Sequence, residues 1–518
     1  MPEPRVVLPD RMNAAELLVD ANVEAGRGAK TAIVDAATGT ATTYEEILRL
    51  SCRFGNAVRE LGVRMEERVM LVLPDSVEFV ASFFGAIRIG AVPIPTNTLL
   101  KPHEYEYLLN DSRARVLVVH ESLLPALEPV LHEARGLRHT VVVGNAGRDR
   151  ISWRDFTEAA SPELSPELMS RDDACFWLYS SGTTGFPKGA VHLQHDMFVA
   201  ADLYALPTLG LTPADRTYSL AKLFFAYGLG NGLYFAFRAG ATTILNPARP
   251  DPVRNFEIIE QYRPTVFYGV PTGYARMLDV PAAAKRFDTR SLRLCVSAGE
   301  ALPAALCETW KREFGVEILD GIGSTEILHI FISNRAGRVK PGSTGEVVPG
   351  YEARIVDEKG SEVPDGAVGD LLIRGDSTCA GYWNQHQKTN ETILGPWIRT
   401  GDKYLRDADG YYWYQGRSDD MLKVGGMWVS PVEVENALAA HPAVLESGVV
   451  GFVDSAGLVK VKATVVLKSG RAGSQELTAE LQTLVKERIG AFKAPQWVEY
   501  VPELPKTATG KTQRYKLR

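Results

Sequence analysis

Residues 180–189 read Ser-Ser-Gly-Thr-Thr-Gly-Phe-Pro-Lys-Gly, a composition typical of a loop that holds phosphate. Glycines let a backbone approach an anion, hydroxyl groups donate hydrogen bonds to it, and Lys188 supplies a positive charge. The stretch follows an apolar run, residues 174–179, whose length and aromatic content indicate a buried strand. The sequence therefore predicts a strand that leads into a phosphate-binding loop.

Two other interpretations apply to such a stretch. Clusters of glycine, serine and threonine often form flexible surface linkers, but Pro187 beside Lys188 and the abrupt end of the apolar strand favour a shaped loop. A Walker-type nucleotide loop requires glycine at position 187 and serine or threonine at position 189, where this chain has Pro187 and Gly189. A Walker-type loop is therefore excluded.

The overall composition is that of an ordinary globular protein. With 518 residues the chain is too long for one hydrophobic core, so two or more domains are expected. Its formal net charge of -6 offers no attraction to nucleic acid, which favours small molecules as partners. The five cysteines are odd in number and show no CxxC spacing, which indicates reduced thiols and not a disulfide or zinc framework.

The sequence shows no targeting or membrane-spanning pattern. Residues 1–5 lack the basic and apolar regions of a signal peptide. The most apolar stretch, residues 79–95, is interrupted by Arg88 and two prolines, so it is unsuited to span a bilayer. A cytoplasmic location is expected, with neither a membrane nor a nucleic acid as partner.

Apolar periodicity alternates between helix and strand in the first part of the chain. Helices are expected at residues 43–61, 76–90 and about 194–206, and strands at residues 69–73, 91–94, 115–119, 140–143, 217–220, 265–271 and 292–300. Such alternation predicts right-handed βαβ units and a largely parallel sheet. Residues 345–405 are rich in turn signals and indicate a small β-rich subdomain.

A charged, glycine-rich connector at residues 414–426 indicates a domain boundary. Beyond it, Ser430-Pro431-Val432-Glu433 has the form of a capping box with proline at the first helical position, which predicts a helix that begins at Ser430. A hairpin of residues 446–453 and 458–467, a helix of residues 474–490 and a strand of residues 497–501 are expected to follow.

The expected fold class is therefore α/β. A large N-terminal domain, residues 1–416, would combine parallel-sheet αβ layers with the β-rich subdomain. A small, mobile α+β C-terminal domain would comprise residues 417–518.

The phosphate loop resembles the signature loop of the adenylate-forming enzymes, a superfamily of acyl-CoA synthetases, adenylation domains of peptide synthetases and firefly luciferase. The resemblance continues in residues 320–326, 397–402 and 505–514 and covers nearly all 518 residues. Residues 224–228, Phe-Phe-Ala-Tyr-Gly, are similar to the benzoate-CoA ligases in particular. A Rossmann fingerprint is a weaker alternative, because Glu326 stands where its third glycine would be.

The resemblance implies that the large N-terminal domain, residues 1–416, carries a site for ATP with magnesium and a site for an aryl acid. The residues that it places around ATP are Ser180, Ser181, Gly182, Thr183, Thr184, Lys188, Ala298, Gly299, Glu300, Asp320, Gly321, Thr325, Asp402 and Arg417. It assigns the β- and γ-phosphates to the loop, ribose to Asp402 and Arg417, and magnesium to Glu326. Lys511 is implied as the catalytic lysine. Taken alone, such residues would be ordinary surface side chains.

The acyl pocket implied by the resemblance consists of Ala226, Tyr227, Gly323, His329 and Ile330. It is short-walled, mostly apolar and uncharged unless His329 is protonated, which suits a flat neutral ring. The resemblance also makes Asp419 the hinge of the C-terminal domain. The residues that it places along the channel for the pantetheine arm of CoA are Lys423, Gly425, Gly426 and Trp428.

The expected function is ATP-dependent activation of an aryl carboxylic acid, in first place benzoate, through an acyl-adenylate. Transfer of the acyl group to CoA would follow, as a step of aromatic acid metabolism. The implied cofactor is Mg²⁺, and the implied co-substrates are ATP and CoA. A homodimer is an option. One alternative is loading of a carrier protein, and another is a substituted benzoate such as 4-hydroxybenzoate or 2-aminobenzoate. A catalytically silent ligand-binding protein is disfavoured, because the family's functional residues are present at Lys188, Glu326, Asp402, Arg417 and Lys511.

Overall fold

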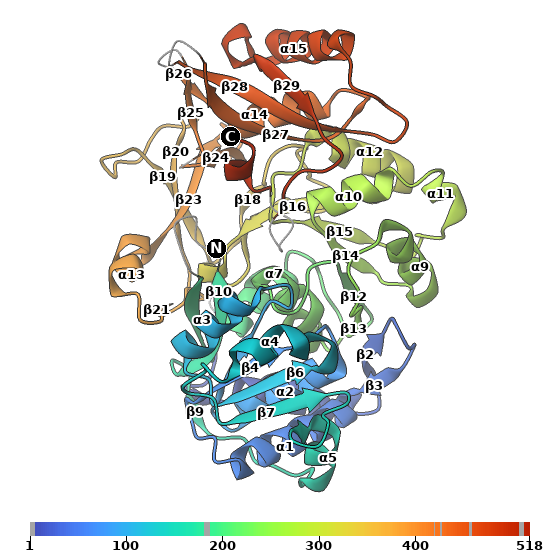
Figure 1. The fold of residues 1–518 in the computed structure, drawn as a ribbon, viewed down its shortest axis with the longest axis vertical. Coiled ribbons are helices and arrows are strands. Elements are labelled where there is room, and N and C mark those ends of the chain that lie inside the picture. Colours follow the sequence, from blue (N-terminus) through green and yellow to red (C-terminus); the bar gives the residue numbers. More distant parts are fainter. Residues whose placement is uncertain (1–5, 181–186, 419, 425–426, 455–457, 507–511) are drawn as a thin grey trace.

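The structure is a computed structural model that describes residues 6–180, 187–418, 420–424, 427–454, 458–506 and 512–518. Three regions follow one another along the long axis of the molecule (Figure 1). An N-terminal αβ layer lies at one end, a nine-stranded sheet occupies the middle, and the C-terminal strands and helices lie at the other end. The predicted α/β class with parallel sheets and a separate C-terminal domain is confirmed.

The N-terminal layer is a five-stranded parallel sheet in the order β5-β4-β6-β7-β8. Its strands are β4 (Arg68–Val72), β5 (Val92–Pro95), β6 (Val116–His120), β7 (His139–Val143) and β8 (Ile151–Ser152). The helices that precede, connect or follow these strands are α1 (Tyr44–Glu60), α2 (Val77–Arg88), α3 (Pro102–Ser112), α4 (Leu124–Leu131) and α5 (Trp153–Ala159). Helix α1 begins as predicted, because Thr43 caps it in a reciprocal pair with Glu46.

The second layer is a nine-stranded sheet in the order β18-β17-β16-β15-β14-β12-β13-β2-β3. Its parallel strands are β2 (Thr31–Asp35), β12 (Arg216–Ser219), β13 (Thr242–Leu245), β14 (Val266–Gly269), β15 (Leu294–Ser297) and β16 (Ile318–Gly323). Antiparallel strands β3 (Ala41–Thr43), β17 (Ile330–Ser333) and β18 (Glu346–Val347) complete its two edges. The predicted parallel pairing is thus divided between two sheets.

Helices of the second layer include α8 (Phe235–Ala239), α9 (Pro252–Tyr262), α10 (Pro271–Leu278), α11 (Ala283–Arg286) and α12 (Ala304–Phe314). One continuous hydrophobic core joins the two sheets, with members such as Phe83 from α2 and Phe237 from α8. Helices cover both sheets, so the central strands are buried on both faces. The sequences of these strands are therefore mainly apolar.

The strand before the phosphate loop belongs to neither parallel sheet. Strand β10 (Ala174–Ser180) pairs in antiparallel fashion with β11 (Lys188–Leu193), which also pairs with β21 (Gly381–Tyr382). The sequence predicted β10 but not β11, since residues 188–193 mix charged and apolar side chains without clear alternation. The helix expected at about 194–206 is formed by α6 (Asp196–Ala200) and the π-helical turn η4 (Ala201–Ala205).

The predicted β-rich subdomain is an antiparallel sheet with strands β19 (Glu352–Val356), β20 (Gly369–Arg374), β22 (Ile393–Leu394), β23 (Trp397–Arg406) and β24 (Tyr412–Arg417). A short helix, α13 (His386–Thr392), precedes β22.

The C-terminal region contains β25 (Leu422–Val424), β26 (Met427–Val429), α14 (Pro431–Ala439), β27 (Val444–Val453), β28 (Val459–Leu467), α15 (Gln475–Ile489) and β29 (Trp497–Tyr500). Strands β27 and β28 form the predicted hairpin, and β29 adds in parallel to β28. A core of its own, including Leu438, Val449 and Leu481, lies between these strands and helices.

Only half of the predicted capping box at α14 is correct. The Ser430 hydroxyl accepts a hydrogen bond from the backbone N–H of Glu433 at 3.1 Å, and Pro431 is the first helical residue. The Glu433 carboxylate, however, accepts from Nζ of Lys493, which lies 2.6 Å from both carboxylate oxygens. A charged tertiary partner has taken the place of the local backbone N–H.

Two further expectations concern the chain as a whole. All five cysteines are buried free thiols. Across the part of the chain that is described, the helices are too short or too polar to traverse a lipid bilayer.

Candidate active site

Five of the predicted ATP-binding residues lie at the carboxyl edge of the nine-stranded sheet. Ala298, Gly299 and Glu300 follow strand β15, while Asp320 and Gly321 lie in the neighbouring strand β16. Ligands of open parallel sheets bind at this edge. The structure therefore brings together two segments that are separated by about twenty residues in sequence.

Asp320 is the buried carboxyl of this group. Its side chain lies inside the protein, and burial raises the pKa of the Asp320 carboxyl well above its ordinary value. Burial of this kind disfavours the charged form of the carboxyl group.

Lys188, the predicted phosphate-binding lysine, and Glu326, the predicted magnesium ligand, both contact Tyr382. The Tyr382 hydroxyl donates a hydrogen bond to Oε1 of Glu326 at 2.6 Å, and Nζ of Lys188 lies 4.6 Å from the centre of the Tyr382 ring. Burial lowers the pKa of Lys188, while the charge of Glu326 opposes that shift. Burial and Glu326 raise the pKa of Tyr382, so its hydroxyl remains a donor.

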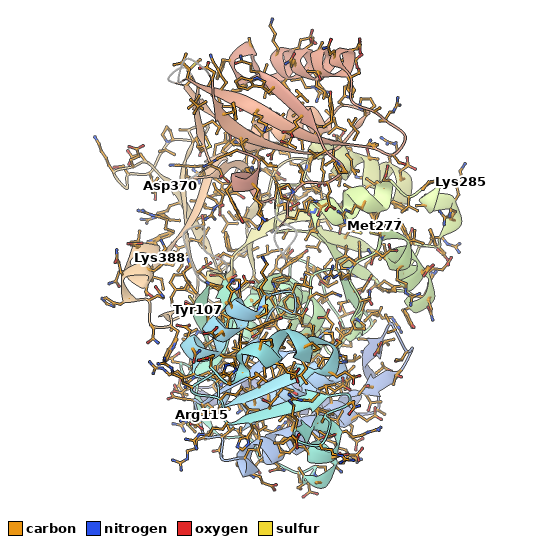
Figure 2. All side chains as sticks on the ribbon, viewed as in Figure 1. Tyr107, Arg115, Met277, Lys285, Asp370 and Lys388 are labelled. Carbon is orange, nitrogen blue, oxygen red and sulfur yellow. The ribbon has the colours of Figure 1, made fainter. Side chains whose placement is uncertain are left out.

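Sequence reasoning missed Tyr382, because it lies 56 residues beyond Glu326 and no local pattern links the two. Two other contacts support the same region. The backbone N–H of Cys379 donates to the carbonyl of Glu326 at 2.8 Å. Tyr107 of α3, labelled in Figure 2, donates to the carbonyl of Pro187 at 3.2 Å, immediately before Lys188.

The two predicted ribose ligands lie opposite each other on adjacent antiparallel strands. Asp402 of β23 and Arg417 of β24 are paired in register, and Nη1 of Arg417 lies 3.2 Å from Oδ1 of Asp402. The Asp402 side chain is 12% exposed and that of Arg417 41% exposed, so the pair has one buried and one accessible member. The Asp402 carboxylate can accept hydrogen bonds from the two hydroxyl groups of a ribose, and the Arg417 guanidinium can donate hydrogen bonds to them.

The predicted acyl-pocket residues also lie together. Nε2 of His329 lies 3.3 Å from the carbonyl of Tyr227 and 3.1 Å from Oδ1 of Asn231, and the rings of Tyr227 and His329 are 5.5 Å apart. Burial lowers the pKa of His329 to about 3. The imidazole is therefore neutral, with its proton on Nε2 because both neighbours are acceptors. The predicted pocket is uncharged.

Close packing of this pocket requires two glycines. A Cβ on Gly323 would lie 2.5 Å from the carbonyl oxygen of His329, across the β16–β17 pair. A Cβ on Gly230, at the start of η5 (Gly230–Tyr234), would lie 2.4 Å from Cδ2 of His329. Ile330 is buried beside this point, and Ala226 begins helix α7 (Ala226–Leu229). Asn231 was missed by sequence reasoning, since its role depends on this tertiary approach.

Several predicted site residues lie outside the described residues: Ser181, Gly182, Thr183, Thr184, Asp419, Gly425, Gly426 and Lys511. Ser180 ends β10 and lies opposite Lys188, the first residue of β11. The backbones of Lys423 and Trp428 are opposite each other in the β25–β26 pair. Thr325 and Glu326 lie in the 3-10 turn η6 (Thr325–Ile327).

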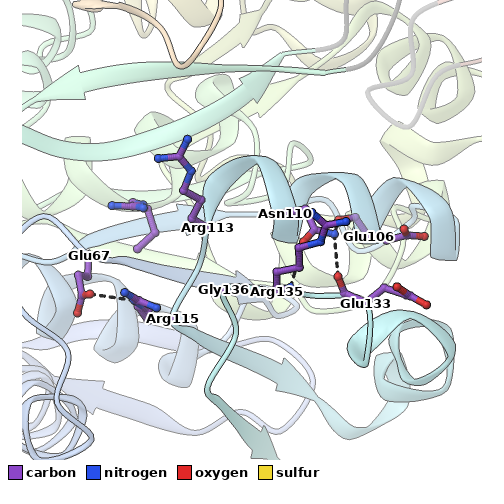
Figure 3. A pocket seen from close by; sticks show the side chains of 9 residues that line it. Glu67, Glu106, Asn110, Arg113, Arg115, Glu133, Arg135 and Gly136 are labelled. Carbon is purple, nitrogen blue, oxygen red and sulfur yellow. Dashed lines mark hydrogen bonds and ion pairs between the residues drawn. The ribbon is translucent and has the colours of Figure 1, made fainter.

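A separate cavity of about 730 Å³ opens beneath helix α3 (Figure 3). It is lined by Glu67, Arg68, Glu106, Asn110, Arg113, Arg115, Glu133, Arg135 and Gly136. None of these is a predicted site residue, and the pair of Arg115 and Glu67, 2.9 Å apart, neutralises part of its charge. We assign this cavity no part in the candidate active site.

The comparisons with known proteins agree with this geometry. Residues 20–383 match the model of the family described as AMP-binding enzyme, and residues 433–511 match the AMP-binding enzyme C-terminal domain. The chain belongs to the AMP-binding enzymes, and the resemblance to the adenylate-forming superfamily is confirmed.

Within the family, the chain is similar to enzymes named for aromatic acids. It is 50% identical to the benzoate–CoA ligase of Thauera aromatica over 517 residues, which are 99% of this chain and 97% of that protein. It is 43% identical to the 4-hydroxybenzoate–CoA/benzoate–CoA ligase of Rhodopseudomonas palustris over 507 residues, covering 98% of this chain and 94% of that one.

Two crystal structures are similar over the whole length. The benzoate CoA ligase from Burkholderia xenovorans LB400 is 47% identical with a TM-score of 0.91, covering 98% of this chain and 100% of that one. The anthranilate CoA ligase AuaEII, in complex with anthranoyl-AMP, is 46% identical with a TM-score of 0.95, covering 98% and 97%.

Proposed function

We propose that this enzyme is an AMP-forming acid–thiol ligase that converts an aryl carboxylic acid, with benzoate preferred, into its CoA thioester. The observation that carries the proposal is the neutral, aromatic cluster of Tyr227 and His329, which adjoins the strand that leads to Glu326. The full-length identity to a benzoate–CoA ligase supports the choice of acid.

The first half-reaction joins two anions. A carboxylate oxygen attacks the α-phosphorus of ATP, the bond to the β-phosphate oxygen breaks, and pyrophosphate leaves. The residues assigned to stabilise this step are Lys511, beside the carboxylate and α-phosphate, and the loop of residues 180–188, around the departing phosphates. Preorganised positive charge of this kind is effective because it is already in place when the transition state forms.

The donor set at Glu326 fits magnesium. Tyr382 donates to Oε1, and Oε2 of the carboxylate makes no hydrogen bond to another described residue, so Oε2 is available to a cation. Among the described residues no cluster of three or more acidic, histidine or cysteine side chains forms a closed metal cage. Mg²⁺ commonly takes one or two carboxylates together with substrate phosphates and water. Mg²⁺ held here would neutralise charge on the phosphates.

The second half-reaction requires a different arrangement. The CoA thiolate attacks the acyl carbonyl, and AMP leaves with the electron pair of the broken C–O bond. We assign the thiol channel to Lys423, Gly425, Gly426 and Trp428, and we propose that residues 417–518 rotate about Asp419 between the half-reactions. Exchange of one catalytic segment for another would let a single site serve both steps. The buried thiols agree with the reducing, cytoplasmic setting that we propose.

We expect Ala226→Leu to test the acyl pocket directly. The added side chain should lower kcat/KM for benzoate and for ring-substituted benzoates by about tenfold, and should affect a smaller carboxylate less. The measurement is kcat/KM across a panel of acids, with fluorobenzoates accepted and octanoate rejected by the parent enzyme. Ala159→Leu, an exposed change at the end of α5, serves as the control.

An octanoate or amino-acid optimum in the parent, or acid ratios unchanged by Ala226→Leu, would contradict the pocket assignment. The same panel is run with free CoA and with a phosphopantetheinylated carrier protein. Acylation of the carrier in place of CoA would favour the carrier-loading alternative.

Tyr382→Phe is expected to weaken magnesium dependence selectively. The ring remains beneath Lys188, but Glu326 loses a hydrogen bond to a charged oxygen, worth about 1.5–3 kcal/mol. The Mg²⁺ concentration for half-maximal pyrophosphate release should rise about tenfold. Tyr411→Phe, which removes an exposed hydroxyl bound to the carbonyl of Arg338, is the control. A magnesium profile that matches the parent would remove Tyr382 from the site.

A further inference from the structure

A fully buried carboxylate lies between two histidines where strand β11 meets helix α6. Oδ2 of Asp196 is 2.7 Å from Nδ1 of His192, and Oδ1 of Asp196 is 3.2 Å from Nε2 of His195. The side chains of Asp196 and His192 are both 0% exposed. Burial of an ionisable group costs free energy unless the group is paired. A buried cluster of three such groups therefore suggests a functional role.

Every ring nitrogen of the two histidines faces an oxygen acceptor. Nε2 of His192 lies 2.8 Å from the carbonyl oxygen of Thr325. Nδ1 of His195 lies 2.8 Å from the carbonyl of Arg171, and its Nε2 lies 2.9 Å from the carbonyl of Asp376. A carbonyl oxygen only accepts hydrogen bonds, so Nε2 of His192 donates to the carbonyl of Thr325. Nδ1 of the same ring faces the Asp196 carboxylate, which fixes the orientation of the ring.

Two of these three carbonyls are connected with the turn that carries Glu326. Thr325 directly precedes Glu326. Asp376 begins the segment in which Ser377 Oγ donates to the carbonyl of Ile327 at 2.9 Å and Cys379 N–H donates to the carbonyl of Glu326 at 2.8 Å. The ring of His192 is itself stacked on Phe176 of β10, with centroids 5.1 Å apart.

The turn needs this support because it ends in a strained residue. Leu328, immediately after η6, has φ 71° and ψ -46°, a backbone conformation that a branched L-residue rarely adopts. Such strain persists only where surrounding contacts over-determine the conformation, and it tends to occur at functional sites.

We propose that His192 and Asp196 are positioning residues for adenylation: they hold the Thr325–Glu326 turn at the distance from the phosphate-loop hairpin that MgATP requires. The inference rests on the proposed function, because it takes Thr325 as an ATP-binding residue and Glu326 as the magnesium ligand. It adds two residues that act through the carbonyl of Thr325.

Two amide substitutions separate the contacts of His192. The amide nitrogen of glutamine reaches about as far as Nε2 and can still donate to Thr325, whereas that of asparagine reaches about as far as Nδ1 and serves Asp196 alone. We expect His192→Gln to bind MgATP within about threefold of the parent, and His192→Asn to bind it about tenfold or more weakly. Calorimetric titration of MgATP, without acid or CoA, measures this difference.

Because that titration needs no acid, failure of the benzoate assignment would leave the result interpretable. In addition, thioester formation from supplied benzoyl-adenylate should stay near the parental rate in His192→Asn. Parental MgATP affinity in this variant, or loss of both half-reactions in proportion to a lowered Tm, would overturn the proposal.

Asp196→Asn provides an independent test that does not depend on the folding of His192→Asn. This change keeps the shape of the side chain and removes its charge. It should give the same selective loss of MgATP affinity, with His192→Gln as the folded reference. Unchanged MgATP affinity in Asp196→Asn would also overturn the proposal.

Discussion

Replacement of Lys511 by alanine is expected to abolish formation of the acyl-adenylate while it largely spares thioester formation from supplied acyl-adenylate. In the proposed mechanism this lysine neutralises charge only where carboxylate and α-phosphate meet. Loss of such stabilisation costs roughly 3 kcal/mol or more, which is on the order of a hundredfold in rate. Pyrophosphate release measures the first half-reaction, and CoA consumption from synthetic benzoyl-adenylate measures the second.

The control is Lys516→Ala, which removes an exposed lysine from the same C-terminal segment. It should leave both half-reactions near the parental rates, because a solvated surface charge contributes little to a buried reaction. Equal losses in the two half-reactions of Lys511→Ala would refute the assignment of this lysine to adenylation alone.

Gly426→Leu is expected to have the opposite effect. Residues 425–426 connect β25 to β26, and we assign this connection to the channel for the pantetheine arm of CoA. A branched side chain there should obstruct the thiol and lower thioester formation by about a hundredfold, as misplacement of a reacting group by 1 Å can do. Pyrophosphate release in a single turnover should persist, since ATP and acid bind elsewhere.

Gly426→Ala gives a graded control, because one methyl group obstructs less than an isobutyl group. CoA turnover by Gly426→Leu at the parental rate would remove this residue from the channel. Lys511→Ala should thus impair only adenylate formation, and Gly426→Leu should impair only thioester formation.

Local signals predicted the elements that depend on local interactions. The helix expected at residues 43–61 is α1, because the Thr43 cap and the apolar spacing lie within a few turns of one another. The hairpin in residues 446–467 was predicted for the same reason. The antiparallel partner of the phosphate-loop strand was not, since β11 has no regular pattern and owes its strand conformation to β10 and β21.

The sequence by itself determined the class of enzyme, because the residues that define the family stand in short ordered motifs such as 180–189 and 320–326, and motif order needs no tertiary information. Only the tertiary structure decided how those residues are held. Tyr382 reaches Glu326 across 56 residues, and His192 reaches Thr325 across 133. The neutral state of His329 likewise follows from complete burial. Hydrogen bonds and desolvation act through space, so partners remote in sequence leave no local pattern, and only the folded chain reveals them.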